Sequence, residues 1–272
     1  MAEFGDFRVI LANLRGDRTS TSVSDLLPAA FHFPAPGRCH RRAPGEVPTV
    51  TPAELAARID QTLLAPTATP AQVEALCEGA RKHRFRAVCV SPSYVPLAVR
   101  HLEGSQVRVC TVVGFPLGSS TPAAKAYEAE EAVRAGARDI DMVINIGRLK
   151  AADLDYVRDE VRAVVRAAAR AAEGIVVKVI IEACHLTDEE KVAACRLAEE
   201  AGAHFVKTST GFGPGGATLE DVRLMRQTVG DRLGVKASGG IRTIAQALAL
   251  LEAGADVLGT SSGDAIIAAS RE

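Results

Sequence analysis

The sequence predicts a single (β/α)8 barrel, a TIM barrel, over residues 51–272, preceded by an N-terminal extension over residues 1–50. Two observations predict this fold: the length of 272 residues, and eight short apolar runs that alternate with helical segments. A barrel of this kind usually takes about 250 residues. Near-continuous apolar strands between helices form a parallel sheet that is covered on its outer face. Eight such units indicate a closed barrel, and an open, doubly wound sheet is the alternative.

Residues 1–50 differ in composition from the rest of the chain. They are rich in serine, proline and arginine, and their one short apolar run lies at 7–14. We therefore expect an appended, flexible extension. The acidic residues Glu3, Asp6 and Asp17 disfavour a transit peptide, and we expect no signal peptide because the start lacks a cationic region and a long apolar core.

Capping boxes mark the start of three predicted helices. Thr-Pro-Ala-Glu at 51–54 and Thr-Pro-Ala-Gln at 69–72 each place a proline at the first helical position, and Thr-Asp-Glu-Glu at 187–190 is a third box. The predicted helices are 52–57, 70–83, 122–135, 153–172, 188–201, 219–229 and 243–253. The predicted strands are 59–64, 87–91, 107–114, 140–145, 175–182, 205–208, 235–237 and 257–260.

Two lysines lie near the ends of neighbouring predicted strands. Lys207 follows His-Phe-Val, Lys236 follows Gly-Val, and small, hydroxyl or glycine residues come directly after each. A buried ammonium group needs a partner or loses its proton. Repulsion between two lysines on successive strands would favour a neutral amine, which a Schiff-base nucleophile requires. The alternative is a pair of lysines whose ammonium groups reach into solvent from the strand ends.

Further polar residues interrupt the apolar strands where the active residues of a barrel belong. Asp60, Cys89, Asp141 and Lys178 all lie within or at the end of predicted strands. Asp139 shares a strand face with Asp141. Asp139 lies nearer the start of the strand, where a role as the cap of the strand would explain it. We therefore prefer Asp141 as the functional carboxylate. The alternative interpretation is a buried ion network that only fills the barrel.

The ends of the last two strands favour a phosphate site. Gly239 and Gly240 follow the seventh strand, and Ser261 and Ser262 follow the eighth and lead into a short helix. Loops at these positions are the usual phosphate site of such barrels, and their backbone N–H groups bind anions. We therefore expect a small phosphorylated substrate. Arg242 either adds positive charge or is a solvated surface residue.

Other functions are disfavoured by composition and spacing. The net charge of −1 argues against nucleic acids or anionic membranes as partners, and no apolar stretch approaches the roughly 20 residues that span a bilayer. Six scattered cysteines without C-x-x-C predict reduced thiols in a cytoplasmic protein. The G-x-G-x-x-G sequence at 211–216 lacks an acidic partner for a ribose and contains Pro214. Neither Cys39-His40 nor Cys184-His185 has a recurrent zinc spacing, so we expect no metal.

Together, these segments resemble the deoxyribose-phosphate aldolase family of class I aldolases over roughly residues 52–268. The stretches that carry the resemblance are IDQTLLAPTAT (59–69), AVCVSPSYV (87–95), VVGFPLG (112–118), DIDMVINIG (139–147), KVIIEAC (178–184), FVKTSTGF (205–212), KASGGIRT (236–243) and LGTSSG (258–263).

The resemblance implies a role for each matching residue. Lys207 would form the Schiff base, Lys236 would favour its neutral form, and Asp141 would belong to the proton relay. The supporting polar network would comprise Asp60, Lys178, Cys89 and Thr208, with Cys89 near the substrate but not a nucleophile. The phosphate would lie against Gly239, Gly240, Ser261 and Ser262. The implied reaction is reversible cleavage of 2-deoxyribose 5-phosphate to glyceraldehyde 3-phosphate and acetaldehyde, without a cofactor.

Three departures from the family pattern accompany this resemblance. Gln61 stands where many family members have a histidine, and Phe212 stands where some members have a lysine. The sequence also ends without the C-terminal tyrosine that assists proton transfer in some members. The alternatives are another Schiff-base barrel lyase, a sugar-phosphate isomerase or epimerase, and a non-catalytic phosphate-binding barrel. We expect a homo-oligomer, since symmetric dimers are the commonest assembly.

Overall fold

The computed structural model describes residues 8–12, 18–22 and 50–271, and the last of these ranges contains a closed barrel. All eight predicted strands are present and parallel, with neighbours in the order β10-β3-β4-β5-β6-β7-β8-β9. The closed barrel is thus confirmed over the open sheet. The strands are β3 (Ile59–Leu63), β4 (Ala87–Val90), β5 (Arg108–Val113), β6 (Asp139–Val143), β7 (Val176–Ile180), β8 (Phe205–Lys207), β9 (Gly234–Ser238) and β10 (Val257–Thr260).

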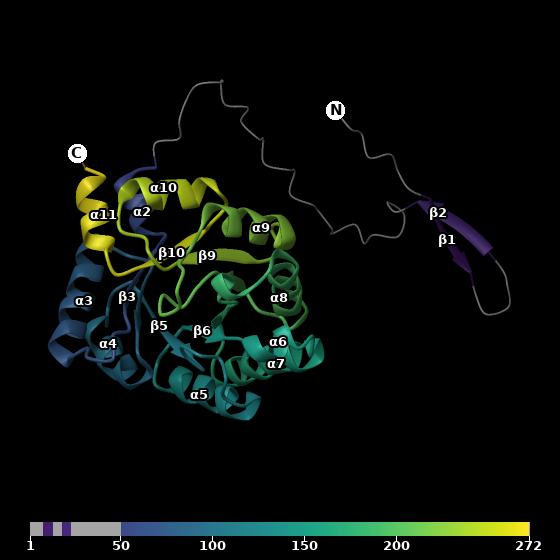
Figure 1. Cartoon of the computed structure of the whole chain (residues 1–272), viewed down its shortest axis with the longest axis horizontal. Coiled ribbons are helices and arrows are strands. Elements are labelled where there is room, and N and C mark those ends of the chain that lie inside the picture. Colours follow the sequence, from purple (N-terminus) through teal and green to yellow (C-terminus); the bar gives the residue numbers. More distant parts are fainter. Residues whose placement is uncertain (1–7, 13–17, 23–49, 272) are drawn as a thin grey trace, which may run out of the picture. The chain divides into compact units, whose positions relative to one another are not determined.

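Helices surround the strands, as Figure 1 shows. They are α2 (Pro52–Ala56), α3 (Pro70–His83), α4 (Val95–His101), α5 (Pro122–Arg134), α6 (Ile146–Lys150), α7 (Leu154–Ala171), α8 (Asp188–Glu200), α9 (Leu219–Val229), α10 (Ile244–Glu252) and α11 (Gly263–Ala269). All seven helices predicted with bounds are present, and so is the short helix expected after the eighth strand. Helices α4 and α6 were not predicted, because five to seven residues are too few to show a helical period.

The capping boxes fix the start of several helices, as predicted. The threonines Thr51, Thr69 and Thr187 each accept a hydrogen bond from the backbone N–H three residues on, and the residue there bonds back to the cap. Thr243 and Gln246 form a fourth box at α10. These bonds satisfy backbone donors that a helix start leaves free.

Strand register brings the inward-facing charges of the barrel to similar heights. Lys207 on β8 is the Cα partner of Lys236 on β9, and Asp141 on β6 is the partner of Lys178 on β7. Apolar residues on the outward faces of the same strands pack against the helices as the core. Alternation along each strand therefore separates an apolar outer layer from a charged interior.

A separate unit, Met1–Pro48, contains two short antiparallel strands, β1 (Arg8–Ala12) and β2 (Arg18–Ser22). This pairing was not predicted, since β2 reads Arg-Thr-Ser-Thr-Ser and lacks an apolar pattern. Most of residues 1–50, for which flexibility was predicted, lie outside the described residues. Among the residues that the structure describes, no helix has the length and apolar character needed to cross a membrane.

Candidate active site

A cluster of charged side chains, six of them buried and two arginines partly exposed, occupies the barrel. Its anionic members are Asp60, Asp139 and Asp141, and its cationic members are Lys178, Lys207, Lys236, Arg86 and Arg108. The three carboxylates, Lys178 and Lys236 are fully buried, while Lys207 is 3% exposed. We call these eight residues the barrel cluster. Its five cationic groups outnumber its three carboxylates.

Asp141 lies at the centre of the barrel cluster. Its Oδ2 accepts hydrogen bonds from Lys207 Nζ at 2.8 Å and from Lys236 Nζ at 2.7 Å. Its Oδ1 accepts from Lys178 Nζ at 3.0 Å. Burial acts to raise the pKa of the Asp141 carboxyl, but the three ammonium groups hold that pKa well below its usual range. Asp141 is therefore an ionised group that links the three lysines.

Asp139 is part of the same network, so its interpretation as a strand cap was wrong. It accepts hydrogen bonds from Lys178 Nζ at 2.5 Å, Arg86 Nη2 at 2.7 Å and Arg108 Nε at 2.5 Å. Asp139 points inward because it lies two residues before Asp141 on one strand. The two arginines were missed, although each stands at or directly before the start of an apolar strand.

Lys236 and Lys178 are each held by several carboxylates. Lys236 Nζ donates to Asp60 Oδ2 at 2.6 Å as well as to Asp141. Burial alone would lower the pKa of Lys236, but Asp141 and Asp60 raise it well above its ordinary value. The pKa of Lys178 is also raised, by Asp141, Cys110 and Asp139 against the effect of burial. Both ammonium groups therefore keep their protons at neutral pH.

Lys207 differs from these two lysines. Asp141 is its single carboxylate partner among the described residues. The sequence predicted that Lys207 and Lys236 would face one another's charge. The structure instead places Asp141 Oδ2 between them, hydrogen-bonded to both ammonium groups. Repulsion is thus reduced locally, while the cluster as a whole keeps its excess of cationic groups.

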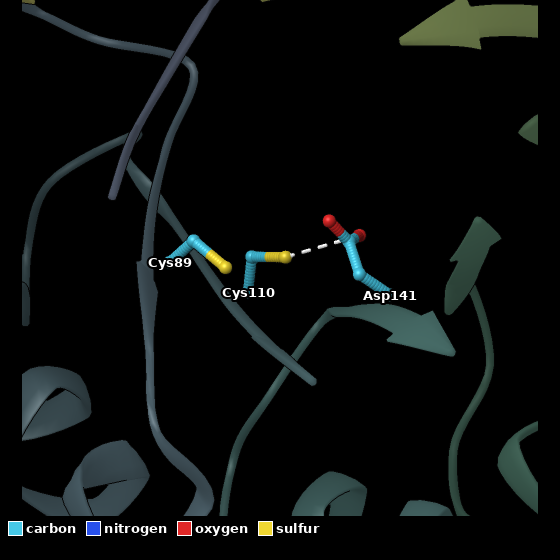
Figure 2. Close-up of side chains that lie close together, drawn as sticks. All are labelled: Cys89, Cys110 and Asp141. Carbon is cyan, nitrogen blue, oxygen red and sulfur yellow. Dashed lines mark hydrogen bonds between the residues drawn. The ribbon is translucent and has the colours of Figure 1, made fainter. Parts of the chain in front are cut away.

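Two cysteines lie close to Asp141, as Figure 2 shows. Cys89 on β4 and Cys110 on β5 are Cα partners, and Cys110 Sγ donates to Asp141 Oδ1 at 3.3 Å. Burial raises the pKa of the Cys110 thiol well above its ordinary value, while the hydrogen bond from Cys110 lowers that of Cys89. Two thiols and a carboxylate could hold a soft metal ion. However, the Asp141 carboxylate already binds three lysines, so we assign no metal there.

A pocket of about 410 Å³ opens above this cluster. Lys207 lines it, and so do three of the four predicted phosphate residues, Gly239, Gly240 and Ser261. Ser262 is not among the lining residues. The remaining lining residues are Thr62, Leu63, Leu64, Ala65, Pro66, Thr210, Gly211, Phe212, Ser238, Ile241, Arg242, Gly259 and Thr260. The predicted anion donors and the predicted nucleophile therefore share one pocket.

Two further residues hydrogen-bond to residues that line this pocket: Glu182, which sequence reasoning missed, and Gln61, which it noted only as a departure from the family pattern. Glu182 is buried, has a positive φ of 53°, and accepts hydrogen bonds from the backbone N–H and the hydroxyl of Thr210. Gln61 accepts from Gly263 N at 2.9 Å and donates to Ser261 O at 3.3 Å. The signal that could have revealed Glu182 was a carboxylate at the end of an apolar strand.

Of the other residues singled out from the sequence, Cys89 and Thr208 lie beside the pocket, whereas Phe212 lines it. Cys89 is fully buried and does not line it. Thr208 is also buried, and its hydroxyl bonds the backbone of Ser238. Phe212 is half exposed and packs edge-on against Phe115, with 5.3 Å between ring centroids. An aromatic side chain thus occupies the position of the lysine that some family members carry.

Comparison with known proteins places the chain in a family. A model described as DeoC/LacD family aldolase matches residues 55–269. Deoxyribose-phosphate aldolase from Carboxydothermus hydrogenoformans is 57% identical over 218 residues, covering 80% of this chain and 96% of that protein. The enzyme of the same name from Thermotoga maritima is 55% identical over 214 residues, covering 79% and 85%. The solved structure of a tetrameric deoxyribose phosphate aldolase from Aeropyrum pernix superposes with a TM-score of 0.76 at 35% identity, covering 82% and 93%.

These matches show that the protein is a lyase of the aldolase class, built on a (β/α)8 barrel. The chain belongs to the DeoC/LacD aldolase family. The resemblance inferred from the sequence is confirmed, and the alternatives of an isomerase or a non-catalytic barrel are not favoured.

Proposed function

We propose that the protein cleaves 2-deoxyribose 5-phosphate reversibly to glyceraldehyde 3-phosphate and acetaldehyde, through a Schiff base on Lys207. One observation carries this proposal. Among the described residues, Lys207 is the lysine of the barrel cluster that lines the pocket, while Lys178 and Lys236 lie beneath it, fully buried. The names of relatives that are more than half identical support the same substrate.

The first chemical step requires a neutral amine at Lys207. The excess of cationic groups in the barrel cluster favours the loss of one proton, since like charges disfavour the ionised state of an amine. Lys178 and Lys236 each contact at least two carboxylates and keep their protons. Lys207 is the lysine that reaches the pocket, so its Nζ is the group that attacks the aldehyde carbon of the substrate and, with loss of water, forms an imine.

The protonated imine makes cleavage of the carbon–carbon bond possible, because it accepts the electron pair of that bond. The C3 hydroxyl loses its proton, the C2–C3 bond breaks, and its electron pair moves into the protonated imine to give an enamine. Protonation at C2 and hydrolysis then release acetaldehyde and restore the lysine. We assign the proton relay to Asp141, whose carboxylate lies 2.8 Å from Lys207 Nζ, and to the charged Lys236, which is hydrogen-bonded to the same carboxylate oxygen. Because the imine accepts the electrons, this sequence of steps uses no metal or organic cofactor.

The phosphate would lie at the other end of the pocket. Gly239 and Gly240 have consecutive positive φ angles of 89° and 79°, which lets the backbone turn sharply at the pocket wall. We assign their N–H groups and the Ser261 hydroxyl as anion donors, with Ser262 next to them in the same turn. The Arg242 side chain lines this pocket and supplies positive charge.

Three further properties belong to this proposal. A homo-oligomer is supported by the tetrameric relative from Aeropyrum pernix. A cytoplasmic, reducing compartment is supported by the free thiols of the five cysteines in the described part of the chain. We also propose that residues 51–272 form the aldolase domain and residues 1–50 an extension outside it.

The direct test is cleavage of 2-deoxyribose 5-phosphate by the full chain, followed as acetaldehyde release. Lys207→Ala should reduce kcat by at least about a thousandfold, since it removes the nucleophile. Lys82→Ala, which changes an exposed lysine of α3, is the control and should retain full activity. Substantial cleavage by folded Lys207→Ala would refute the Schiff-base assignment.

A further inference from the structure

The hydroxyl of Ser238 is a buried polar group that has no hydrogen-bond partner among the residues described by the structure. Ser238 is 5% exposed and is the last residue of β9. An unpaired buried hydroxyl destabilises a folded protein, so such groups are rare unless a ligand or water supplies the partner. The position of Ser238 indicates which ligand group this would be.

Ser238 lies between the two ends of the pocket. It lines the pocket together with Lys207, and Gly239 and Gly240 follow it directly. It comes two residues after Lys236 on the same strand face, which moves it about 7 Å along the strand toward the glycines. The hydroxyl is therefore placed beside the middle of a ligand whose aldehyde end meets Lys207 and whose phosphate meets the glycines.

The neighbours of Ser238 hold it in place and leave room for its hydroxyl. Thr208 Oγ1 donates to the Ser238 carbonyl at 3.2 Å and accepts from its backbone N–H at 3.0 Å. Gly259 is the Cα partner of Ser238 on β10, and a Cβ at that position would lie 2.3 Å from Ser238 Oγ. A fixed backbone and a glycine neighbour thus present this hydroxyl in one position, as preorganised binding requires.

We propose that Ser238 Oγ donates a hydrogen bond to the C4 hydroxyl of 2-deoxyribose 5-phosphate, which is the C2 hydroxyl of glyceraldehyde 3-phosphate. This inference rests on the proposed function, with C1 at Lys207 and the phosphate at the glycines. Two hydroxyls lie between those ends of the substrate. The C3 hydroxyl loses its proton toward Asp141 during cleavage, which leaves the C4 hydroxyl for Ser238. Ser238 is accordingly a specificity-determining residue for 2-hydroxy aldehydes as acceptors.

The test compares two acceptors for acetaldehyde: glyceraldehyde 3-phosphate, and 3-phosphooxypropanal, which lacks the C2 hydroxyl. The wild-type protein should prefer the hydroxylated acceptor by about tenfold in kcat/KM, the effect of one hydrogen bond to a site built for it. Ser238→Ala should lower kcat/KM about tenfold for glyceraldehyde 3-phosphate and leave the value for 3-phosphooxypropanal unchanged. The preference should therefore disappear in this variant.

Ser209→Ala is the matched control. Ser209 is also buried with an unpaired hydroxyl in the described structure, but it does not line the pocket. This variant should keep the tenfold preference of the wild-type protein. Thermal unfolding should show that neither alanine variant is less stable, since neither hydroxyl forms a hydrogen bond to lose.

Three outcomes would overturn the inference. An undiminished preference in Ser238→Ala would show that the hydroxyl does not contact C2-OH. An equal loss of kcat/KM for both acceptors would place the hydroxyl on the phosphate or give it a purely structural role. Wild-type protein that adds acetaldehyde to neither acceptor would refute the proposed function itself, and this inference with it.

Discussion

Three buried lysines share one carboxylate in this barrel, and their surroundings give them different roles. Lys178 and Lys236 contact several carboxylates each, which raises the pKa of both and keeps them charged. Lys207 contacts Asp141 alone among the described carboxylates and lines the pocket. Under the proposed mechanism, access to the substrate is what separates Lys207, the nucleophile, from the two lysines that stay buried as ammonium groups.

Replacement of Lys236 tests whether charge activates Lys207. Lys236→Leu removes a cationic group that shares Asp141 Oδ2 with Lys207, and with it the like charge on which the proposed activation depends. The acid limb of the kcat/KM profile against pH should then move to higher pH, and activity at pH 7 should fall by at least about tenfold. The measurement is the cleavage rate from pH 5 to pH 10. Lys236→Arg keeps the charge and should keep the acid limb in place; an identical profile for Lys236→Leu would contradict activation by charge.

At the scale of helices and strands, a second buried ion pair fixes the strand that carries Asp141. Lys125 on α5 donates to Glu160 Oε2 on α7 at 2.7 Å and to the carbonyl of Val143 at 2.8 Å, and Glu160 Oε1 accepts from Asn145 N at 2.5 Å. Both charged side chains are fully buried. Burial lowers the pKa of Lys125 and raises that of Glu160, so each depends on the other to remain charged. The pair connects two helices to the end of β6.

Breaking this pair should destabilise the barrel. Lys125→Met leaves the Glu160 carboxylate buried without its cation, which costs about 3–5 kcal/mol in the free energy of unfolding. The double variant Lys125→Met/Glu160→Leu should recover part of that loss, because no unpaired charge remains. Urea unfolding at pH 7 provides the comparison. Lys150→Met, which breaks a more exposed pair with Glu190, should have a far smaller effect; equal effects of the two single variants would show that the buried pair is not important for stability.

Sequence patterns predicted the long elements but not every short one. The strands were found because near-continuous apolar runs are typical of a parallel barrel, and three of the helices because threonine capping boxes begin them. Helix α6 covers five residues and β2 is wholly polar, so neither has a period that a sequence can show. The network around Asp139 could not be predicted either. It depends on strand register, which brings Arg86 and Arg108 to a carboxylate far away in the sequence.

At the scale of the whole molecule, one barrel provides both halves of the site. Lys207 and Asp141 come from middle strands, while Gly239, Gly240 and Ser261 come from the loops after the last two strands. Sequence reasoning placed these residues at one end of a barrel because active residues gather at the carboxyl ends of its strands. It could not reveal the unpaired hydroxyl of Ser238, since whether a group is paired depends on every neighbour in three dimensions.

Removal of the N-terminal unit tests the proposed domain division. Since the chain divides into Met1–Pro48 and Thr49–Glu272, deletion of residues 1–48 leaves Val50 and the Thr51 cap of α2 in place. The shortened chain should keep kcat/KM for 2-deoxyribose 5-phosphate within about twofold of the full chain, because the barrel forms a core of its own. Activity assays and thermal unfolding of both chains make the comparison. An inactive or unfolded product would show that the extension is required by the barrel.

Borohydride reduction in the presence of acetaldehyde tests whether Lys207 forms a Schiff base. Peptide mass mapping of the full chain should show one reduced acetaldehyde unit on Lys207, and none on that peptide in Lys207→Ala. An adduct on Lys178 or Lys236 instead would keep the reaction class but contradict the assignment of the nucleophile. The absence of any specific adduct, with folded and active protein, would contradict the imine mechanism.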